Sequence, residues 1–287
     1  MNQIKLFIEL TRLNKPIGYM LLFWPCAWGL TLAYDFNGEI ITYLFYISLF
    51  FIGAILMRSA GCIVNDIADR KFDKKISRTK KRPIASGQIS ILKGIIYSLI
   101  LCSFAFLILI QFNYFTIILA LGSMPLAFTY PYMKRYTYWP QLFLGVTFNY
   151  GLLLGWSSIY NEINLITIIF YLSSIFWTLG YDTIYGFQDI KDDEIIGLKS
   201  TSIKFKSNPY FFLKICYLIF LLGLIMVGYY ADYNFYYFIM IAIISIQLFY
   251  TQIFNLNTNI QTNCLKTFKS NNILGLFVFL AIVVGKI

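Results

Sequence analysis

Long apolar stretches recur along most of the chain and constrain its fold more than any other feature of the sequence. A helix needs about 20 mainly apolar residues to cross a bilayer. The sequence contains about nine such stretches: 17–34, 42–64, 91–111, 114–131, 140–160, 163–186, 209–230, 234–254 and 271–286. We therefore expect an all-α polytopic membrane protein, in which about nine transmembrane helices form one bundle around a central cavity that opens to the cytoplasmic side.

The composition supports this class of protein. Of the 287 residues, 59% are hydrophobic and only 13% are charged, whereas an ordinary soluble domain is about 25% charged. The N-terminal segment MNQIKLFIELTRLNKP resembles neither a secretory signal nor a transit peptide, so we expect it to form an amphipathic helix on the membrane surface. These observations argue against a soluble globule and against a disordered chain.

The chain contains no histidine, which excludes several kinds of catalytic site. Triads that depend on histidine, zinc or haem held by histidine, and histidine proton relays are all ruled out. The five cysteines are scattered and form no C-x-x-C pair, so we interpret them as small apolar residues in membrane helices. Any metal ion must therefore be held by oxygen or sulfur.

The net charge of +10 is distributed unevenly between the two sides of the predicted bundle. With the N-terminus inside, almost all Lys and Arg residues fall in inner segments, and only Lys286 lies outside. This is the asymmetry of the positive-inside rule, so the basic residues, including the run Lys80, Lys81 and Arg82, need no nucleic-acid partner. We expect a bacterial inner membrane with the active site facing the cytoplasm, and a mitochondrial membrane is the alternative.

Two clusters of acidic residues follow long apolar spans on the inner side. The first cluster lies in NDIADRKFD, where Asn65, Asp69 and Asp73 recur at i, i+4 and i+8, and Asp66 joins them. The second lies in DTIYGFQDIKDDE, which contains Asp182, Tyr185, Asp189 and Asp193. The first spacing places the carboxylates on one face if the helix continues, and Asp182, Tyr185 and Asp189 show a similar i, i+3, i+7 pattern.

Carboxylates that converge in a partly desolvated place need cations. Mg²⁺ favours oxygen ligands and is commonly held by one or two carboxylates together with substrate phosphates. Basic residues near the clusters are suited to the phosphate oxygens that the metal leaves uncovered: Arg70, Lys71, Lys134, Arg135 and Lys199. We therefore predict two related halves of a single domain over 1–287, roughly 1–135 and 136–287, that grip a diphosphate through Mg²⁺ with an apolar tail among the helices.

Five segments in order resemble the UbiA-type intramembrane prenyltransferase superfamily over nearly the whole chain. NDIADRKFD resembles its NDxxDxxxD motif and DIKDD its second, DxxxD motif. Three further segments resemble the branch that prenylates 4-hydroxybenzoate for ubiquinone synthesis: RLNKPIGYMLLFWPCAWGL, RPIASGQIS and YPYMKRYTYWPQ. The resemblance implies nine helices, Mg²⁺, a polyprenyl diphosphate donor and an aromatic acceptor.

The same resemblance implies roles for individual residues. It places Asp66, Asp69, Asp73, Asp189 and Asp193 at the diphosphate–metal positions, and Arg58 and Asn65 near the acceptor. Beyond the resemblance, an arginine inside a membrane needs an anionic partner, so we expect Arg58 to bind the acceptor carboxylate. Asp182 or Asp189 is expected to polarise the phenol.

Other functions stay open at this point. Acidic residues within the membrane and repeated halves also occur in ion-coupled transporters. However, transporter acids tend to lie near the midplane, whereas these lie at helix ends among basic residues. Within the superfamily, the acceptor is 4-hydroxybenzoate or, alternatively, a naphthoate, homogentisate, a porphyrin or another tetrapyrrole.

Overall fold

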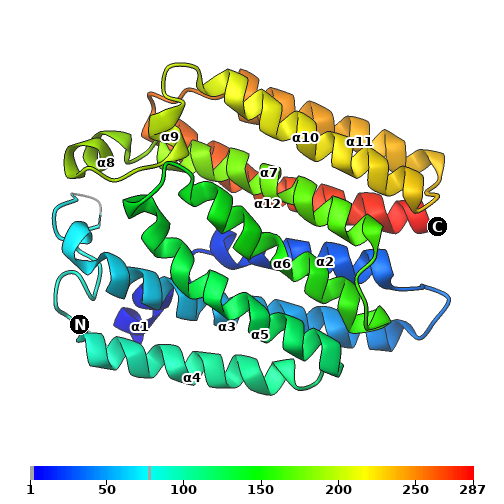
Figure 1. Ribbon diagram of the computed structural model, residues 1–287, viewed down its shortest axis with the longest axis horizontal. Helices are drawn as coiled ribbons and strands as arrows, with labels where there is room; N and C mark the ends of the chain where they lie inside the picture. The colour runs from blue at the N-terminus through cyan, green and yellow to red at the C-terminus, as the bar shows by residue number, and fades with distance from the viewer. Residues whose placement is uncertain (1–2, 77–78) are drawn as a thin grey trace.

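The computed structural model describes residues 3–76 and 79–287, and every regular element within these residues is a helix (Figure 1). The elements are α1 (Gln3–Thr11), α2 (Ile17–Ala33), α3 (Ile40–Asp73), α4 (Ile91–Leu109), α5 (Tyr114–Thr129), the 3₁₀ helix η1 (Tyr130–Arg135), α6 (Pro140–Tyr160), α7 (Leu165–Gly186), α8 (Ile190–Ile196), α9 (Thr201–Lys204), α10 (Pro209–Tyr230), α11 (Phe235–Gln247), the π-helix η2 (Leu248–Phe254) and α12 (Gln261–Lys286). The expected all-α fold class is confirmed.

The long helices match the predicted spans, but the count of nine is not confirmed. In the described part of the chain, eight helical segments are long and apolar enough to cross a membrane. The apolar helix α2 occupies the first predicted span but has 17 residues, which is shorter than the others. The fold is thus a membrane helix bundle with eight clear spans and one shorter apolar helix near its centre.

Two helices extend beyond the predicted apolar stretches. Helix α3 continues to Asp73 and includes the whole first acidic cluster. Helix α12 begins at Gln261, ahead of the stretch 271–286, because polar residues near its start find partners inside the bundle. For example, Gln261 Nε2 donates a hydrogen bond to the Gln188 carbonyl oxygen at 2.9 Å, and Ser270 Oγ accepts one from Gln252 Nε2 at 3.0 Å.

Several helices begin at a side-chain cap that the sequence provides. The side chains of five residues at N-caps accept hydrogen bonds from backbone amides one turn further along the helix: Ser90, Asn113, Asn164, Ser200 and Asn234. Such caps satisfy one of the free amides at a helix start. They explain why the polar turns end sharply at these positions.

Helix α2 lies inside the bundle and packs against α3, α6 and α12. Close approach to α6 depends on small residues, because a Cβ on Gly29 would lie 2.0 Å from the Leu152 carbonyl oxygen. Aromatic rings fill the space on another side, where the Trp28 ring lies 5.0 Å from that of Trp177. Small residues at helix contacts are the common basis of close packing in membranes.

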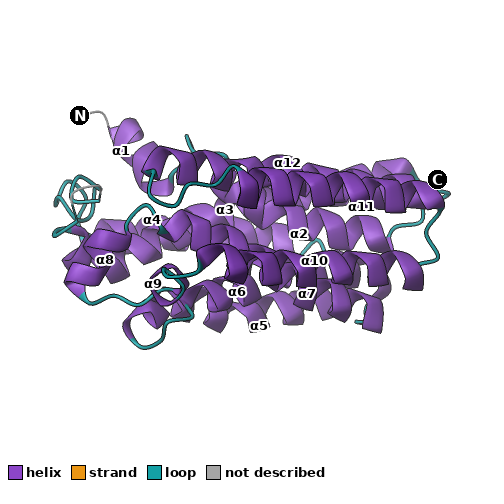
Figure 2. Cartoon of the chain, turned by 90° about the horizontal axis from the view of Figure 1, so that it is seen from above, coloured by secondary structure: helices purple, strands orange, loops and turns teal. Residues whose placement is uncertain are grey.

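The polar segments gather at one end of the bundle, which we call the charged end. Figures 1 and 2 show α1, α8 and α9 at this end, together with the loop that follows α3. At the opposite end, Lys286 Nζ donates hydrogen bonds to the Leu32 and Tyr34 carbonyl oxygens at 2.8 and 2.6 Å. Lys286 thus binds free carbonyls at the C-terminal end of α2, which explains a lysine at an end whose turns otherwise carry only acidic charges, such as Asp35 and Glu39.

Candidate active site

The last two turns of α3 place three carboxylates side by side at the charged end. Because α3 is continuous to its end at Asp73, the helical spacing of Asp66, Asp69 and Asp73 is realised in the structure. Their exposed fractions are only 1%, 2% and 4%. Buried carboxylates of this kind require partners that neutralise them.

Two arginines from different segments neutralise Asp66 and Asp73. Arg12, which follows α1, places Nη2 2.5 Å from Asp66 Oδ1. Arg82, from the loop after α3, places Nη1 3.1 Å from the same oxygen and 2.9 Å from Asp73 Oδ2. Arg82 therefore bridges two carboxylates that are two helical turns apart.

The third carboxylate, Asp69, is held by η1. Lys134 Nζ forms an ion pair and a hydrogen bond with Asp69 Oδ2. Arg135 Nη2 lies 3.8 Å from Asp69 Oδ1 and donates a 2.6 Å hydrogen bond to the Ala68 carbonyl oxygen. Of the residues predicted to bind phosphate, Lys134 and Arg135 therefore lie beside the first acidic cluster.

Arg58 lies deeper in the bundle on α3. Its guanidinium stacks 5.5 Å from the centre of the Phe148 ring on α6. A Cβ on Gly18 would lie 2.9 Å from Arg58 Nε, so the glycine leaves room for the guanidinium. Arg58 also interacts electrostatically with Asp182 on α7, and its buried Nε has no hydrogen-bond partner among the described residues.

The remaining predicted residues of the first motif differ in exposure. Asn65 and Arg70 are partly buried, and Arg70 Nε is a buried atom without a hydrogen-bond partner in residues 3–76 and 79–287. Lys71 is exposed near the end of α3. Of these three residues, Asn65 and Arg70 thus have the more enclosed surroundings.

The second acidic cluster is divided between two helices, which corrects the predicted spacing. Asp182 and Tyr185 lie on α7, but α7 ends at Gly186, and Asp189 directly precedes the separate helix α8 that contains Asp193. The expected i, i+3, i+7 face through Asp189 is therefore wrong. The break follows a glycine that disfavours helix, and a Cβ on this glycine would lie 2.3 Å from Ser202 Oγ.

Backbone contacts connect the segment after α8 with η1. The Lys199 amide donates to the Lys134 carbonyl oxygen at 2.8 Å, and Lys199 Nζ donates to the Tyr136 carbonyl oxygen at 3.1 Å. Lys134 in turn contacts Asp69. A chain of contacts thus runs from the first acidic cluster to the segment that follows the second one, although the Lys199 side chain itself binds a carbonyl.

An aromatic contact lies beside Tyr185. Its ring centre is 4.6 Å from that of Phe268 on α12, which also lies 5.8 Å from the ring of Tyr181. Tyr185 therefore packs against the last helix.

Sequence reasoning missed two residues of the site, Arg12 and Arg82, which it counted only as inner positive charges. Both contact Asp66, but they lie 54 and 16 residues from it in the chain. Burial acts to lower the pKa of Arg12, whereas the neighbouring Cys62 and Asp66 favour the charged form, and the net effect raises this pKa above its usual value. A basic residue in an inner segment gives no sequence signal that separates such a role from topology.

The donor set suits a metal ion that arrives with a phosphorylated substrate. Among the described residues, no three Cys, Asp or Glu side chains converge so that they hold an ion by themselves. Mg²⁺ is usually bound through one or two carboxylates, with substrate phosphates and water completing its shell. Asp69 Oδ1 is buried and has no hydrogen-bond partner within the described ranges, so an oxygen ligand is available at the first cluster.

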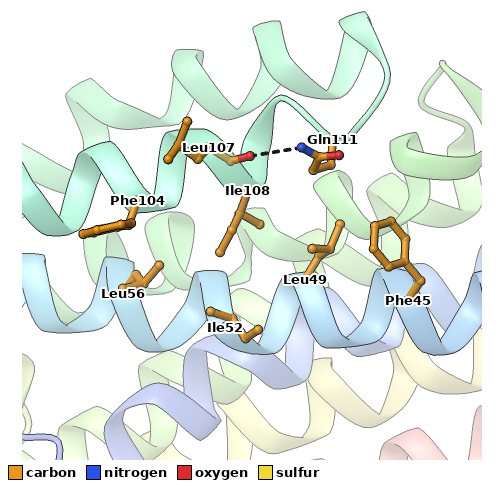
Figure 3. A pocket seen from close by; sticks show the side chains of 8 residues that line it. All are labelled: Phe45, Leu49, Ile52, Leu56, Phe104, Leu107, Ile108 and Gln111. Atoms are coloured by element: carbon orange, nitrogen blue, oxygen red, sulfur yellow. Dashed lines mark hydrogen bonds between the residues drawn. The ribbon is translucent and has the colours of Figure 1, made fainter.

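An apolar groove on the described surface contains none of the residues of this site. Figure 3 shows it between α3 and α4, with a volume of about 530 Å³. Seven of its lining residues are apolar and the eighth is Gln111, and Phe104 and Leu107 are more than half exposed. Such a surface suits contact with lipid chains and has no group that binds phosphate.

Comparison with solved structures supports the fold. A UbiA homolog from Aeropyrum pernix K1 matches with a TM-score of 0.76 and 20% identity, over 93% of this chain and 98% of that one. A UbiA homolog from Archaeoglobus fulgidus bound to DMAPP and Mg²⁺ matches with a TM-score of 0.67 and 17% identity, over 97% and 99%. At these identities the likeness shows the shared fold.

Curated relatives are more similar in sequence. The mitochondrial 4-hydroxybenzoate polyprenyltransferase of Drosophila pseudoobscura pseudoobscura is 43% identical over 98% of this chain and 70% of its own length. The human protein of the same name is 42% identical over 98% of this chain and 75% of its own length. The likeness therefore extends over almost the whole chain.

These relatives correct the predicted location. A bacterial inner membrane was expected, but the relatives are mitochondrial proteins of eukaryotes, which points to a mitochondrial membrane. The prediction failed because the distribution of charge orients a helix bundle in a bilayer without identifying which bilayer it is.

A family model provides the last comparison. The model described as the UbiA prenyltransferase family matches residues 22–280, which include both acidic clusters and all of the helices from α3 to α11. The chain belongs to the UbiA prenyltransferase family.

Proposed function

We propose that the protein transfers a polyprenyl group from polyprenyl diphosphate to 4-hydroxybenzoate in ubiquinone biosynthesis. The group is attached to the ring carbon beside the hydroxyl, which gives 3-polyprenyl-4-hydroxybenzoate and diphosphate. The observation that carries this proposal is the 43% identity, over 98% of the chain, to a relative that is named for this reaction.

The charged end supplies groups for the diphosphate. Lys134 and Arg135 lie beside Asp69, and guanidinium and ammonium groups are strong donors to phosphate oxygens. In this proposal Arg70, Lys71 and Lys199 assist them at the edge of the site. These cations stabilise the negative charge that develops on the leaving group.

Mg²⁺ completes the proposed donor site. The residues that would hold it are Asp66, Asp69, Asp73, Asp189 and Asp193. The UbiA homolog from Archaeoglobus fulgidus bound to DMAPP and Mg²⁺ supports the choice of ion. The buried oxygen of Asp69, which has no hydrogen-bond partner in the described residues, supports Asp69 as a ligand. When bound, the ion neutralises diphosphate charge and so weakens the bond to the allylic carbon.

The acceptor site is proposed deeper along α3. Arg58 binds the carboxylate of 4-hydroxybenzoate, with Asn65 one to two turns closer to the charged end and Tyr185 as a further contact. Asp182, which interacts with Arg58 electrostatically, or Asp189 polarises the phenol. This arrangement places the ring between the acceptor anchor and the diphosphate.

The reaction then replaces the allylic carbon–oxygen bond with a carbon–carbon bond and removes one ring proton. The allylic carbon–oxygen bond breaks and its electron pair leaves with the diphosphate, so the prenyl group becomes an allylic cation. The ring carbon beside the hydroxyl attacks this cation with its π electrons, and the ring proton passes to a carboxylate base. Surrounding helices exclude water that would otherwise quench the cation.

The test is a prenyl-transfer assay on membranes that contain the protein. Labelled 4-hydroxybenzoate is incubated with polyprenyl diphosphates of several lengths and Mg²⁺, and a naphthoate, homogentisate and a porphyrin serve as alternative acceptors. We expect prenylated 4-hydroxybenzoate as the product. Prenylation of another acceptor alone, or transport of a solute in vesicles with no prenyl transfer, would overturn the proposal.

A further inference from the structure

Arg12 is held in an unusual backbone conformation next to a carboxylate. Its backbone φ of +56° lies in the left-handed region, which residues other than glycine rarely adopt. Its Nη2 lies 2.5 Å from Asp66 Oδ1, and its Nη1 donates to Cys62 Sγ at 3.5 Å. Strained backbone of this kind persists where surrounding contacts fix it, and it is concentrated at functional sites.

The surrounding contacts come from α1. Leu6 and Leu10 are buried in a cluster with Ile63 on α3 and Ile84 in the loop after α3. Helix α1 is thus anchored to α3, while Arg12 lies in the short connection between α1 and α2. The guanidinium can therefore change partner by rotation of its own side chain, without movement of a spanning helix.

Arg12 occupies an oxygen that a metal ion would need. Asp66 Oδ1 accepts from both Arg12 and Arg82, so a divalent cation that approaches this oxygen meets two positive charges at short range. Repulsion between like charges at such distances is strong in a poorly solvated site. A diphosphate changes this balance, because it offers Arg12 an alternative anionic partner.

We propose that Arg12 is a displaceable counter-ion that couples the binding of diphosphate to the binding of the divalent cation. Before diphosphate binds, Arg12 shares the neutralisation of Asp66 Oδ1 with Arg82. When diphosphate enters, the Arg12 guanidinium moves to a phosphate oxygen, so that Asp66 Oδ1 keeps one cationic partner instead of two and becomes more available to the metal ion. This inference rests on the proposed function, since it assigns Arg12 a positioning role for the same diphosphate.

The proposal makes opposite predictions for the two ligands taken separately. In Arg12→Gln, Asp66 loses one competing charge, so Mg²⁺ alone binds more tightly. The same variant lacks a guanidinium for the phosphate, so inorganic pyrophosphate alone binds more weakly. We expect the dissociation constant for Mg²⁺ to fall and that for pyrophosphate to rise, each by about 5-fold to 10-fold. Such changes are at the lower end of typical coupling between sites.

The experiment is calorimetric titration of the full chain in detergent. Mg²⁺ is titrated without pyrophosphate, and pyrophosphate is titrated in EDTA, so that no complex of the two forms in solution. Arg12→Lys keeps the charge and is expected to bind Mg²⁺ as the wild type does. The matched control is Lys93→Gln, which removes a positive charge whose 2.8 Å hydrogen bond to Gln3 joins α4 to α1, and we expect both dissociation constants to stay unchanged.

The outcomes separate this inference from the proposed function. A damaged fold weakens binding of both ligands, so tighter Mg²⁺ binding together with weaker pyrophosphate binding supports the role of Arg12. If the wild type binds both ligands and Arg12→Gln binds each of them unchanged, or both more weakly, only the role of Arg12 is overturned. A wild type that binds neither ligand overturns the proposed diphosphate chemistry as well.

Discussion

At the scale of single residues, the site depends on charges that are buried in pairs. Removing one member of such a pair destabilises the folded protein by more than the intact pair stabilises it, because the remaining buried charge has no partner. Asp69 is buried against Lys134, and a change of charge at this residue is therefore expected to have a large effect.

Asp69→Asn tests the proposed metal and diphosphate site. The substitution keeps the shape of the side chain but removes the carboxylate, so turnover should fall by about 100-fold or more, as for loss of other preorganised electrostatic groups. The measurement is product formation in membranes, with the amount of inserted protein determined by immunoblot. Near-normal turnover would show that Asp69 holds neither the metal ion nor a cation for the diphosphate.

Arg58→Ala tests the proposed acceptor site. Because Arg58 is expected to bind the acceptor carboxylate, the KM for 4-hydroxybenzoate should rise about tenfold or more, while the KM for the prenyl diphosphate changes little. Steady-state kinetics with each substrate varied in turn makes the measurement. An unchanged KM for the acceptor would remove Arg58 from this role.

At the scale of elements, the contact between α2 and α6 fixes the centre of the bundle. A Cβ on Gly155 would lie 2.3 Å from the Cys26 carbonyl oxygen. We expect Gly155→Ala to destabilise the protein by about 1–3 kcal/mol, the usual cost of overpacking, and to lower the unfolding temperature in detergent. Gly53→Ala is the matched control, because nothing lies within 4 Å of its Cβ position, and it should leave this temperature unchanged or raise it.

Also at this scale, the sequence predicted most spans but not where two helices end. Hydropathy identifies apolar residues, but it does not detect polar residues that become part of a helix because they form hydrogen bonds or ion pairs in the folded chain. The polar start of α12 is one case, since Gln261 donates a hydrogen bond to the carbonyl oxygen of Gln188, which is 73 residues away. Arg12 and Arg82 are another, because only the folded chain brings them to Asp66. The division into two related halves stays a prediction.

At the scale of the whole molecule, the fold and the proposed reaction should respond differently to loss of metal. The side chains of Arg12, Arg82 and Lys134 neutralise all three carboxylates of the first cluster. We therefore expect the bundle to stay folded without a metal ion. EDTA should therefore abolish prenyl transfer and leave the unfolding temperature unchanged. Restoration by excess Mg²⁺ is the control, and full activity in EDTA would contradict the proposed role of the ion.

The attachment of the last helix at the end opposite the charged end has a mechanical consequence. Besides the two bonds from Lys286, Asn234 Nδ2 donates to the Val284 carbonyl oxygen at 2.9 Å, so the end of α12 is fixed to α2 and to the turn before α11. A helix that is fixed at one end moves furthest at the other, and α12, with 26 residues, has a length of about 39 Å. A tilt of about five degrees around the fixed end therefore displaces the start of α12, which contacts the Gln188 carbonyl oxygen, by about 3 Å.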